Sequence, residues 1–549
     1  MRGPKWLKNC VFYEIYPQTY YDTNNDGIGD IQGIIEKLDY VKNIGCDAIW
    51  LNPWYVSPFN DAGYDITDYY NVAPRYGNND DARRLFEEAH RRDMHIIIDL
   101  VPGHTSLECP WFKESQKVEK NAYSDRYIWS PYMMWKGDPE LNRDEDYYVT
   151  GYSQRGAYKT NFYYNQPALN YGYEKPKYEW EQPVDAEGPR ATVEEIKNIM
   201  RFWLNMGCDG FRVDMASSLI KRDKNYKGII RLWKEFREMF DKEYPEAILV
   251  SEWGNPPIAI KAGFHCDFGL DAGGPYTYDN LVRDCWAWYM PGANKFPPPV
   301  FGLEGEGDPK SFFTNYMNHL KETEKKGYIS MFSGNHDVHR LAKFLSPDEM
   351  KVFFAFLFTM PGVPFLYYGD EIGMNYIDGL SKEGGSLRTG SRTPMQWNNW
   401  ANKGFSNANP EDLYLPVDDS PEAPTVNAQY DDPNSILSKV RELIAIRKKY
   451  VPLQANGGIE PLYVKSNTYP FIYERYSGER KIIVVINPTR FNYDVEIPYK
   501  AKIISDISSM RVTAKRGRGC IKFKAKAVSY GIFQILDKET NYYVKKKNS

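Results

Sequence analysis

Residues 95–101 read HIIIDLV, a continuous apolar run that predicts a strand buried on both faces. Residues 80–91 precede it and predict a helix with Asn79 as N-cap and with Leu85 and Phe86 on its buried face. Similar short strands recur along the chain, separated by helical stretches, at residues 47–52, 209–214, 247–252, 328–332 and 363–368. This alternation indicates parallel βαβ units, which form either an open sheet or a closed barrel.

Two segments interrupt the alternation. Residues 103–174 are polar and rich in tyrosine and glycine, which indicates a small domain inserted after the third strand. After an amphipathic helix at residues 436–449, two β-rich runs flank Ser477 and Gly478, a pair typical of a β-hairpin. We therefore expect the chain to end in a C-terminal antiparallel β-sandwich.

The composition narrows the classes of function. Of the 549 residues, 42% are hydrophobic and 26% are charged, as in ordinary globular proteins. A net charge of −4 argues against nucleic-acid binding through phosphate neutralisation. The longest apolar run, residues 352–368, contains Pro361, Gly362 and Pro364, and predicts a buried helix, turn and strand instead of a membrane span. We expect no nucleic-acid partner and no membrane association.

Cysteine usage and the first residues bear on the compartment. The seven cysteines are scattered and show no metal-ligand spacing, so we expect reduced thiols. The first residues lack the apolar core of a signal peptide. Both features predict a cytoplasmic protein, which we expect to act as a monomer or a small homo-oligomer.

Three acidic residues follow predicted strands: Asp214 ends DGFRVD, Glu252 ends AILVSE, and Asp337 follows YISMFSGNH. In a barrel the carboxyl ends of all strands meet on one face, where active sites are built. Glycoside cleavage needs two carboxyl groups, one to protonate the leaving oxygen and one to attack or to activate water. A single acidic residue at such a place is more often a helix cap, but three in distinctive motifs favour a catalytic site.

Several motifs support this interpretation, and they occur in a fixed order: GYD (63–65), DLVPGH (99–104), QPALN (166–170), GFRVD (210–214), SEWGN (251–255), FSGNHD (332–337), YYGDEIG (367–373) and RTPMQW (392–397). Together they resemble the α-amylase family of glycoside hydrolases, family thirteen, and its oligosaccharide-cleaving α-glucosidase-like branch. The resemblance implies a (β/α)8 TIM barrel formed by residues 1–103 and 175–455. It also implies an inserted domain at residues 104–174 and the C-terminal β-sandwich at residues 456–549.

The resemblance implies a role for each matching residue. Asp214 corresponds to the nucleophile, Glu252 to the acid/base, and Asp337 to the carboxylate that binds sugar hydroxyls and favours the distorted transition state. Arg212, two residues before Asp214, points to the same side of its strand and would keep the nucleophile ionised. The other substrate-binding residues that it implies are Tyr64, Asp65, His104, His336 and Arg392.

Three positions depart from the family pattern. Gly103 stands where the first motif usually has Asn, and Ala168 stands where the inserted domain usually has Asp. In the amylases these two positions help to hold a calcium ion, so we expect that particular site to be absent. Ser218 stands where amylases often have a His that contacts the leaving sugar, which argues against an amylase-like polymer cleft.

These features favour a retaining, exo-acting α-glucosidase that hydrolyses short malto- or isomalto-oligosaccharides or disaccharides from the non-reducing end. We expect Asp65 and Arg392 to recognise the terminal sugar as a charged pair, although a structural salt bridge is the alternative role for Arg392. Tyr163 and Tyr164 of the insertion would form another wall of the pocket.

Two other functions stay open. The first is a trehalose synthase-type isomerase or transglucosidase of the same fold, which shares the covalent intermediate. The second is a non-catalytic sugar-binding subunit, similar to the heavy chains of amino-acid transporters.

A calcium ion is expected in the segment DTNNDGIGD at residues 22–30. Oxygen-bearing residues at alternate positions, a glycine at the tight turn and one backbone carbonyl resemble the front of a calcium loop. The alternative is a polar turn with Asp22 and Asp30 as caps. The ligands of this structural calcium site would be Asp22, Asn24, Asp26, the carbonyl of Ile28, and Asp30.

Overall fold

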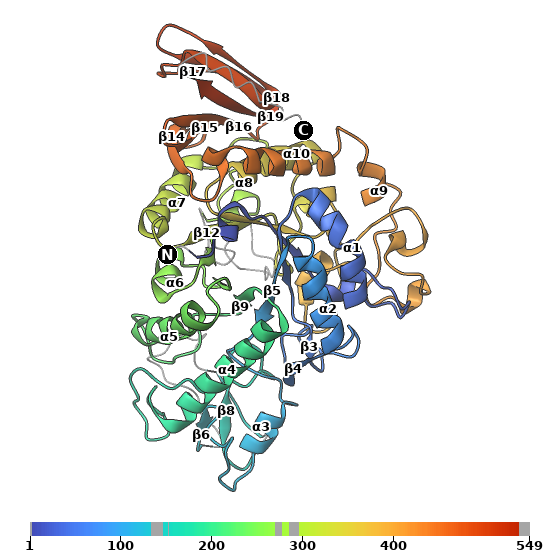
Figure 1. Cartoon of the computed structure of the whole chain (residues 1–549), viewed down its shortest axis with the longest axis vertical. Coiled ribbons are helices and arrows are strands. Elements are labelled where there is room, and N and C mark those ends of the chain that lie inside the picture. Colours follow the sequence, from blue (N-terminus) through green and yellow to red (C-terminus); the bar gives the residue numbers. More distant parts are fainter. Residues whose placement is uncertain (1–2, 133–146, 152, 270–276, 285–295, 537–549) are drawn as a thin grey trace, which may run out of the picture.

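The computed structural model describes residues 3–132, 147–151, 153–269, 277–284 and 296–536 (Figure 1). Eight of the described strands close into a parallel barrel in the order β1-β13-β12-β11-β10-β9-β5-β2. The strands are β1 (Phe12–Ile15), β2 (Ala48–Leu51), β5 (His95–Leu100), β9 (Gly210–Val213), β10 (Ile248–Ser251), β11 (Cys266–Phe268), β12 (Tyr328–Phe332) and β13 (Val363–Tyr367). The barrel is confirmed, and the open sheet is excluded.

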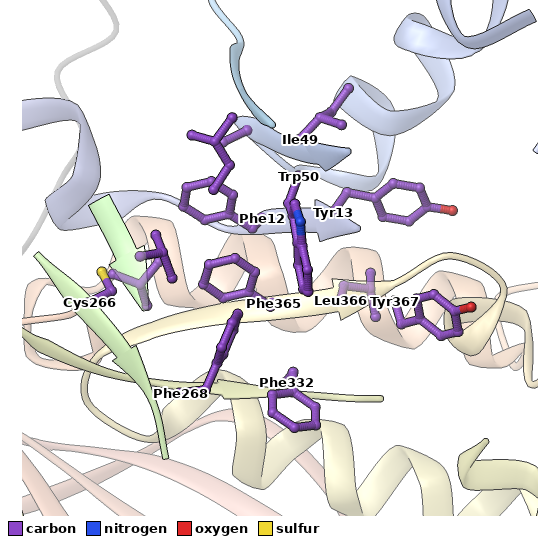
Figure 2. Packing of buried hydrophobic residues seen from close by; sticks show 14 of the residues in the cluster. Phe12, Tyr13, Ile49, Trp50, Cys266, Phe268, Phe332, Phe365, Leu366 and Tyr367 are labelled. Atoms are coloured by element: carbon purple, nitrogen blue, oxygen red, sulfur yellow. The ribbon is translucent and has the colours of Figure 1, made fainter. Parts of the chain in front are cut away.

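Aromatic rings fill the interior of the barrel. The rings of Phe12 and Phe365, on neighbouring strands, stack with their centroids 4.3 Å apart. The ring centroid of Phe268 lies 5.0 Å from that of Phe365 and 5.5 Å from that of Trp50. Figure 2 shows these side chains converging between the strands. Because both faces of each strand are covered, the strands are mostly apolar, and the charged residues within them, such as Glu14, Asp99 and Arg212, are buried. The barrel is thus a packed core whose chemistry is confined to its ends.

Helices cover the outside of the barrel, and Figure 1 shows them around its strands. They are α1 (Ile31–Ile44), α2 (Asn79–His90), α4 (Glu187–Met206), α5 (Lys227–Glu243), α6 (Pro256–Ala262), α7 (Pro309–Thr323), α8 (Pro347–Thr359) and α10 (Ile436–Lys449), with a short α9 (Val426–Gln429). Helix α2 begins one residue earlier than predicted. Asn78 is its N-cap, since its side chain accepts from the amides of Asp80 and Asp81, whereas Asn79 accepts from Val72 N.

The predicted insertion lies between β5 and α4. It contains α3 (Pro110–Ser115) and a three-stranded sheet of β6 (Trp129–Ser130), β8 (Ala157–Lys159) and β7 (Tyr148–Val149). A hairpin of β3 (Tyr55–Val56) and β4 (Asp68–Val72) precedes it after β2. The insertion is anchored at the barrel mouth, where Leu169 N donates to Gly103 O at 3.0 Å. The residue boundaries given above for the three domains stay predictions.

The C-terminal part is one six-stranded antiparallel sheet of half-barrel or sandwich-like shape, seen at the top of Figure 1. Its strands are β14 (Gly458–Lys465), β15 (Thr468–Ser477), β16 (Arg480–Asn487), β17 (Tyr493–Ile497), β18 (Ile503–Arg516) and β19 (Ile521–Leu536). The first part of β19 pairs with β17 and its last part with β16, while β18 runs along most of its length. One long strand therefore links the two halves of the domain.

Two buried arginines bind the C-terminal end of α8, and one of them, Arg475, belongs to the sheet and so links it to the barrel. Arg447 of α10 donates to the carbonyls of Phe358 and Met360 at 2.9 and 2.8 Å, and Arg475 of β15 donates to Thr359 O. Cations at the C-terminal end of α8 satisfy carbonyls that have no partner within the helix.

Within the described ranges, no helix combines the length and the apolarity needed to cross a membrane. The apolar run at residues 352–368 forms most of α8, a turn and β13, as predicted. Six cysteines are buried free thiols, whereas Cys285 lies outside the described residues.

Candidate active site

Two of the three predicted carboxylates lie side by side at the carboxyl ends of neighbouring barrel strands. Asp214 follows β9 and Glu252 follows β10, and the register of these neighbouring strands pairs Val213 with Ser251. Ala216 N also donates to Glu252 O at 3.1 Å. The two side chains are therefore placed by strand pairing, not by a flexible loop.

Arg212 joins these carboxylates to a third one. Its Nη1 lies 2.6 Å from Asp99 Oδ1 and 3.1 Å from Asp214 Oδ1, and its Nη2 lies 2.9 Å from Glu252 Oε2. One planar guanidinium thus fixes three carboxylates from three neighbouring strands. The expected contact of Arg212 with Asp214 is present. Asp99, which lies in the motif DLVPGH, was not predicted as a site residue.

The electrostatics of the pair favour one proton on Glu252. Burial raises the pKa of Asp214 to about 7, against the opposing effect of Arg212. Burial raises the pKa of Glu252 further, to about 8, and the nearby Asp214 adds to the rise. Both donors to Glu252, Arg212 and Met215 N, reach Oε2, which leaves Oε1 to carry a proton. Such an arrangement supplies an ionised nucleophile beside a protonated acid.

Asp337 lies in a cationic setting instead. Its Oδ1 accepts from Arg388 Nη1 and from Arg392 Nη2, both at 2.9 Å. Although burial opposes ionisation, the guanidinium groups of Arg388 and Arg392 hold the pKa of Asp337 well below its usual range. This carboxylate is therefore an acceptor for hydroxyl groups and not a proton donor.

Two residues that the sequence interpretation missed complete this side of the site. Arg388 lies 3.4 Å from Asp61 Oδ1 through Nη2, which also donates to Tyr163 OH at 3.0 Å. Asp61 Oδ2 accepts from Gln166 Nε2 at 2.7 Å, and burial raises the pKa of Asp61 to about 6. The available signals were the first acidic residue in NDAGYD, Asp61, and the first arginine in SLRTGSRTPMQW, Arg388.

Asp65 does not lie where the sequence interpretation placed it. Its Oδ1 accepts from Ser57 Oγ and from Asp61 N at 3.0 Å each, and its Oδ2 accepts from Asn60 N at 2.9 Å. These donors belong to its own turn, so the side chain is used to hold that turn. The predicted pairing of Asp65 with Arg392 is therefore corrected, because Asp61 is the carboxylate that faces the arginines.

The two predicted histidines and Tyr64 form one buried group. His336 bonds to Glu14 Oε1 through Nδ1 and to Tyr64 OH through Nε2, at 2.8 Å each. His104 bonds to Tyr64 O through Nε2 at 3.1 Å and to Asn161 Nδ2 through Nδ1 at 3.2 Å. Burial lowers the pKa of His104 to about 4 and that of His336 well below its usual value, so both rings are neutral. A sugar hydroxyl must exchange with one of these partners to reach either ring.

Loop 22–30 has a compact polar structure of its own. Asp22 Oδ1 accepts from Asn25 N at 2.8 Å and Asp26 Oδ1 accepts from Ile28 N at 2.9 Å. Asp30 is the N-cap of α1, since Oδ1 accepts from Gly33 N at 2.7 Å. In the described part of the chain, no group of three or more His, Cys, Asp or Glu side chains is arranged to hold a metal. The expected site also relies on Asn24 and on the carbonyl of Ile28, so calcium stays a proposal.

The comparisons with known proteins agree with this geometry. A family profile described as the catalytic domain of alpha-amylase matches residues 14–456. The chain belongs to the alpha-amylase family. Family membership makes it an enzyme of the glycoside hydrolase type, and the retaining mechanism is a property of the family. A non-catalytic subunit is therefore disfavoured.

Relatives in the family have two kinds of activity in their names. The chain is 32% identical over 542 residues to a trehalose synthase/amylase of Mycobacterium tuberculosis, covering 90% of this chain and 84% of that protein. It is 31% identical over 561 residues to an oligo-1,6-glucosidase of Parageobacillus thermoglucosidasius, covering 90% and 93%. The solved structure of a trehalulose synthase of Pseudomonas mesoacidophila superposes with a TM-score of 0.79 at 25% identity, covering 97% and 100%. The chain is thus similar to glycosidases and to isomerases of the family.

Proposed function

We propose that the protein is a retaining exo-acting α-glucosidase, which releases glucose from the non-reducing end of short α-glucosides. The observation that carries the proposal is the cluster of Asp61, Asp337, Arg388 and Arg392 beside the catalytic pair. The family and its glucosidase-named relatives support the substrate class.

The roles in the reaction follow from charge and position. Asp214 attacks the anomeric carbon, and Glu252 gives its proton to the departing oxygen. A glycosyl-enzyme bound through Asp214 results, and Glu252, now ionised, takes a proton from the water that resolves it. Arg212 contacts both carboxylates, so it can stabilise whichever of them is charged at each step. Two displacements at the same carbon retain its configuration.

The residues that close one side of the site support the exo preference. Tyr163 OH donates to Gly384 O at 3.2 Å and accepts from Arg388 Nη2, so the insertion meets the segment after β13. Arg392 is buried, and its Nη1 has no hydrogen-bond partner among the described residues. A buried N–H without a partner is costly, but this atom is closed to solvent, so the arginine must shift on substrate binding before a terminal sugar hydroxyl can satisfy it. An internal sugar unit has a glycosidic oxygen and a further ring at that place.

A product profile tests the exo preference. Early in the reaction, maltoheptaose should give glucose and maltohexaose, and soluble starch should barely lose viscosity. Arg392→Ala should relax the preference for chain ends. A spread of mid-length products from the outset would contradict the proposal.

An isomerase of the trehalose synthase type is the second candidate. The trehalose synthase relatives and the trehalulose synthase structure favour it. Both candidates share the glycosyl-enzyme and differ in whether water or a retained sugar resolves it. Incubation with maltose separates them, because glucose as the main product supports hydrolysis and trehalose supports isomerisation.

A further inference from the structure

Asn161 of the insertion contacts two residues at the catalytic centre. It follows β8, and its backbone is held in place because Asn161 N donates to Gln166 O at 3.0 Å. Its side-chain Nδ2 donates to His104 Nδ1 at 3.2 Å and to Met215 Sδ at 3.6 Å. His104 belongs to the first family motif, and Met215 directly follows Asp214. One amide group therefore reaches both the pocket wall and the nucleophile loop.

Gly103 provides the space for this side chain. A Cβ atom on Gly103 would lie 2.5 Å from Asn161 Nδ2 and 3.2 Å from its Cγ. The backbone of Gly103 lies outside the left-handed region, so the position does not require glycine for its own conformation. The absent side chain is what matters. Gly103 is also one of the positions where this chain departs from the family pattern.

The contacts of His104 specify one tautomer. Nε2 faces the carbonyl of Tyr64 at 3.1 Å, so it must carry the hydrogen. Nδ1 faces the amide hydrogen of Asn161, so it must be the acceptor. Because burial lowers the pKa of His104 to about 4, the ring is neutral and only this arrangement satisfies both nitrogens. The Nε2–H is then ready to donate to a sugar hydroxyl that displaces Tyr64 O.

The contact with Met215 leads on to the acid/base. Met215 has a left-handed backbone with φ +42°, which is uncommon for a bulky residue. In this conformation its N–H donates to Glu252 Oε2 at 2.9 Å. A hydrogen bond to a carboxylate favours its ionised form, so this amide opposes the rise in the pKa of Glu252 that burial causes. The Asn161 contact to Sδ holds the side chain of the residue that carries this amide.

We propose that Asn161 is a positioning residue, which fixes the tautomer of His104 and holds Met215 against the acid/base, and that Gly103 is the residue that admits it. The catalytic part of this inference rests on the proposed roles of Asp214, Glu252 and His104. The tautomer part is a statement about the free enzyme and does not depend on them.

A double-mutant cycle in the full chain tests the coupling of the two positions. Asn161→Ala should lower kcat/KM by on the order of 10- to 100-fold, as displaced catalytic groups do. It should also move the alkaline limb of the pH profile to higher pH, because Glu252 loses the support of its charged form. Gly103→Ala should reproduce both effects alone and add little in the Asn161→Ala background. Asn165→Ala is the matched control from the same segment and should change neither.

Nitrogen-15 NMR of histidine-labelled enzyme tests the tautomer directly, with His104→Gln to assign the signal. The inference predicts an Nε2–H tautomer for His104 and a shift toward Nδ1–H or imidazolium in Asn161→Asp, where a carboxylate replaces the donor. An Nδ1–H tautomer in the unmutated enzyme would overturn it, as would fully additive effects of Gly103→Ala and Asn161→Ala. An active Asp214→Ala variant would instead overturn the proposed function and leave the tautomer result standing.

Discussion

Two aspartates at opposite ends of the segment DGFRVD, Asp209 and Asp214, show how position within a barrel decides the role of a residue. Asp209 precedes β9 at the end of the barrel where the strands begin. There it bonds to His90 and His95 at 2.9 Å each and accepts from Ile96 N at 2.8 Å. Although burial opposes it, these histidines lower the pKa of Asp209. Asp214 follows β9 at the opposite end of the barrel, where the strands finish, and burial raises its pKa to about 7. The position of Asp209 favours a role in stability, and the position of Asp214 favours its proposed role in catalysis.

The largest effect is expected from Asp214→Asn. The amide keeps the size of the side chain but cannot attack the anomeric carbon. We therefore expect kcat to fall by on the order of 10,000-fold or more, as when the nucleophile is removed from a group of catalytic residues that act together. Thermal melting should show a Tm no lower than that of the unmutated chain, because one buried charge is removed. A large loss of Tm would mean that Asp214 has a structural role like that of Asp209.

Replacing the acid should cost less and should change the pH profile. The proposed mechanism requires Asp214 to be ionised and Glu252 to be protonated, so kcat/KM should fall below about pH 7 and above about pH 8. Glu252→Gln should lower kcat by roughly 100- to 10,000-fold on substrates with poor leaving groups. It should also abolish the alkaline limb. An alkaline limb that persists in Glu252→Gln would assign it to another group.

Removal of Asp209 should affect stability and leave catalysis nearly intact. Asp209→Ala leaves Ile96 N without its partner and should cost about 1–3 kcal/mol of unfolding free energy, measured by denaturant titration. The hydrogen bond to Asp209 raises the pKa of His90 in the folded state. Its stabilising effect is therefore complete below the pKa that His90 has in the unfolded chain, and it is lost as the pH rises through the higher pKa of the folded state. The unmutated chain should therefore lose stability relative to Asp209→Ala as pH rises from about 6 to 8. A difference that stays constant over this range would contradict the account.

The smallest effect concerns loop 22–30. This loop follows β1 at the carboxyl end of the strands but does not belong to the cluster around Asp214 and Glu252. If calcium binds there, the stabilisation follows from mass action, and a gain of about 1 kcal/mol would raise Tm by roughly 1 °C in a chain of this length. Calorimetry with and without a chelator measures this shift, and elemental analysis measures the bound metal. An unchanged Tm together with no divalent metal would leave the polar turn as the full explanation.

The sequence was sufficient for features that depend on pattern. Alternation of strands and helices predicted the βαβ units, and the places of Asp214 and Glu252 followed because strand ends in a barrel share one face. Asp61 and Asp65 could not be distinguished, because both lie in NDAGYD. The choice depends on a turn in which Asp65 binds the amides of Asn60 and Asp61. Such side-chain-to-backbone bonds leave no periodic signal.

Arg388 was missed for a related reason. It lies in a long segment after β13 with little regular structure, so nothing in the sequence indicates the direction of its side chain. Only the folded segment brings it to Asp337 and Asp61. Asn161 is similar, since its contact with His104 depends on the space left at Gly103.

The most direct test of the central claim is the identity of the nucleophile. In Glu252→Gln, α-glucosyl fluoride should still glucosylate the enzyme, because fluoride leaves without an acid, and the missing base should slow hydrolysis of the adduct. Peptide mapping by mass spectrometry should then find glucose on the peptide that contains Asp214. An adduct on another carboxylate, or turnover without any adduct, would contradict the account.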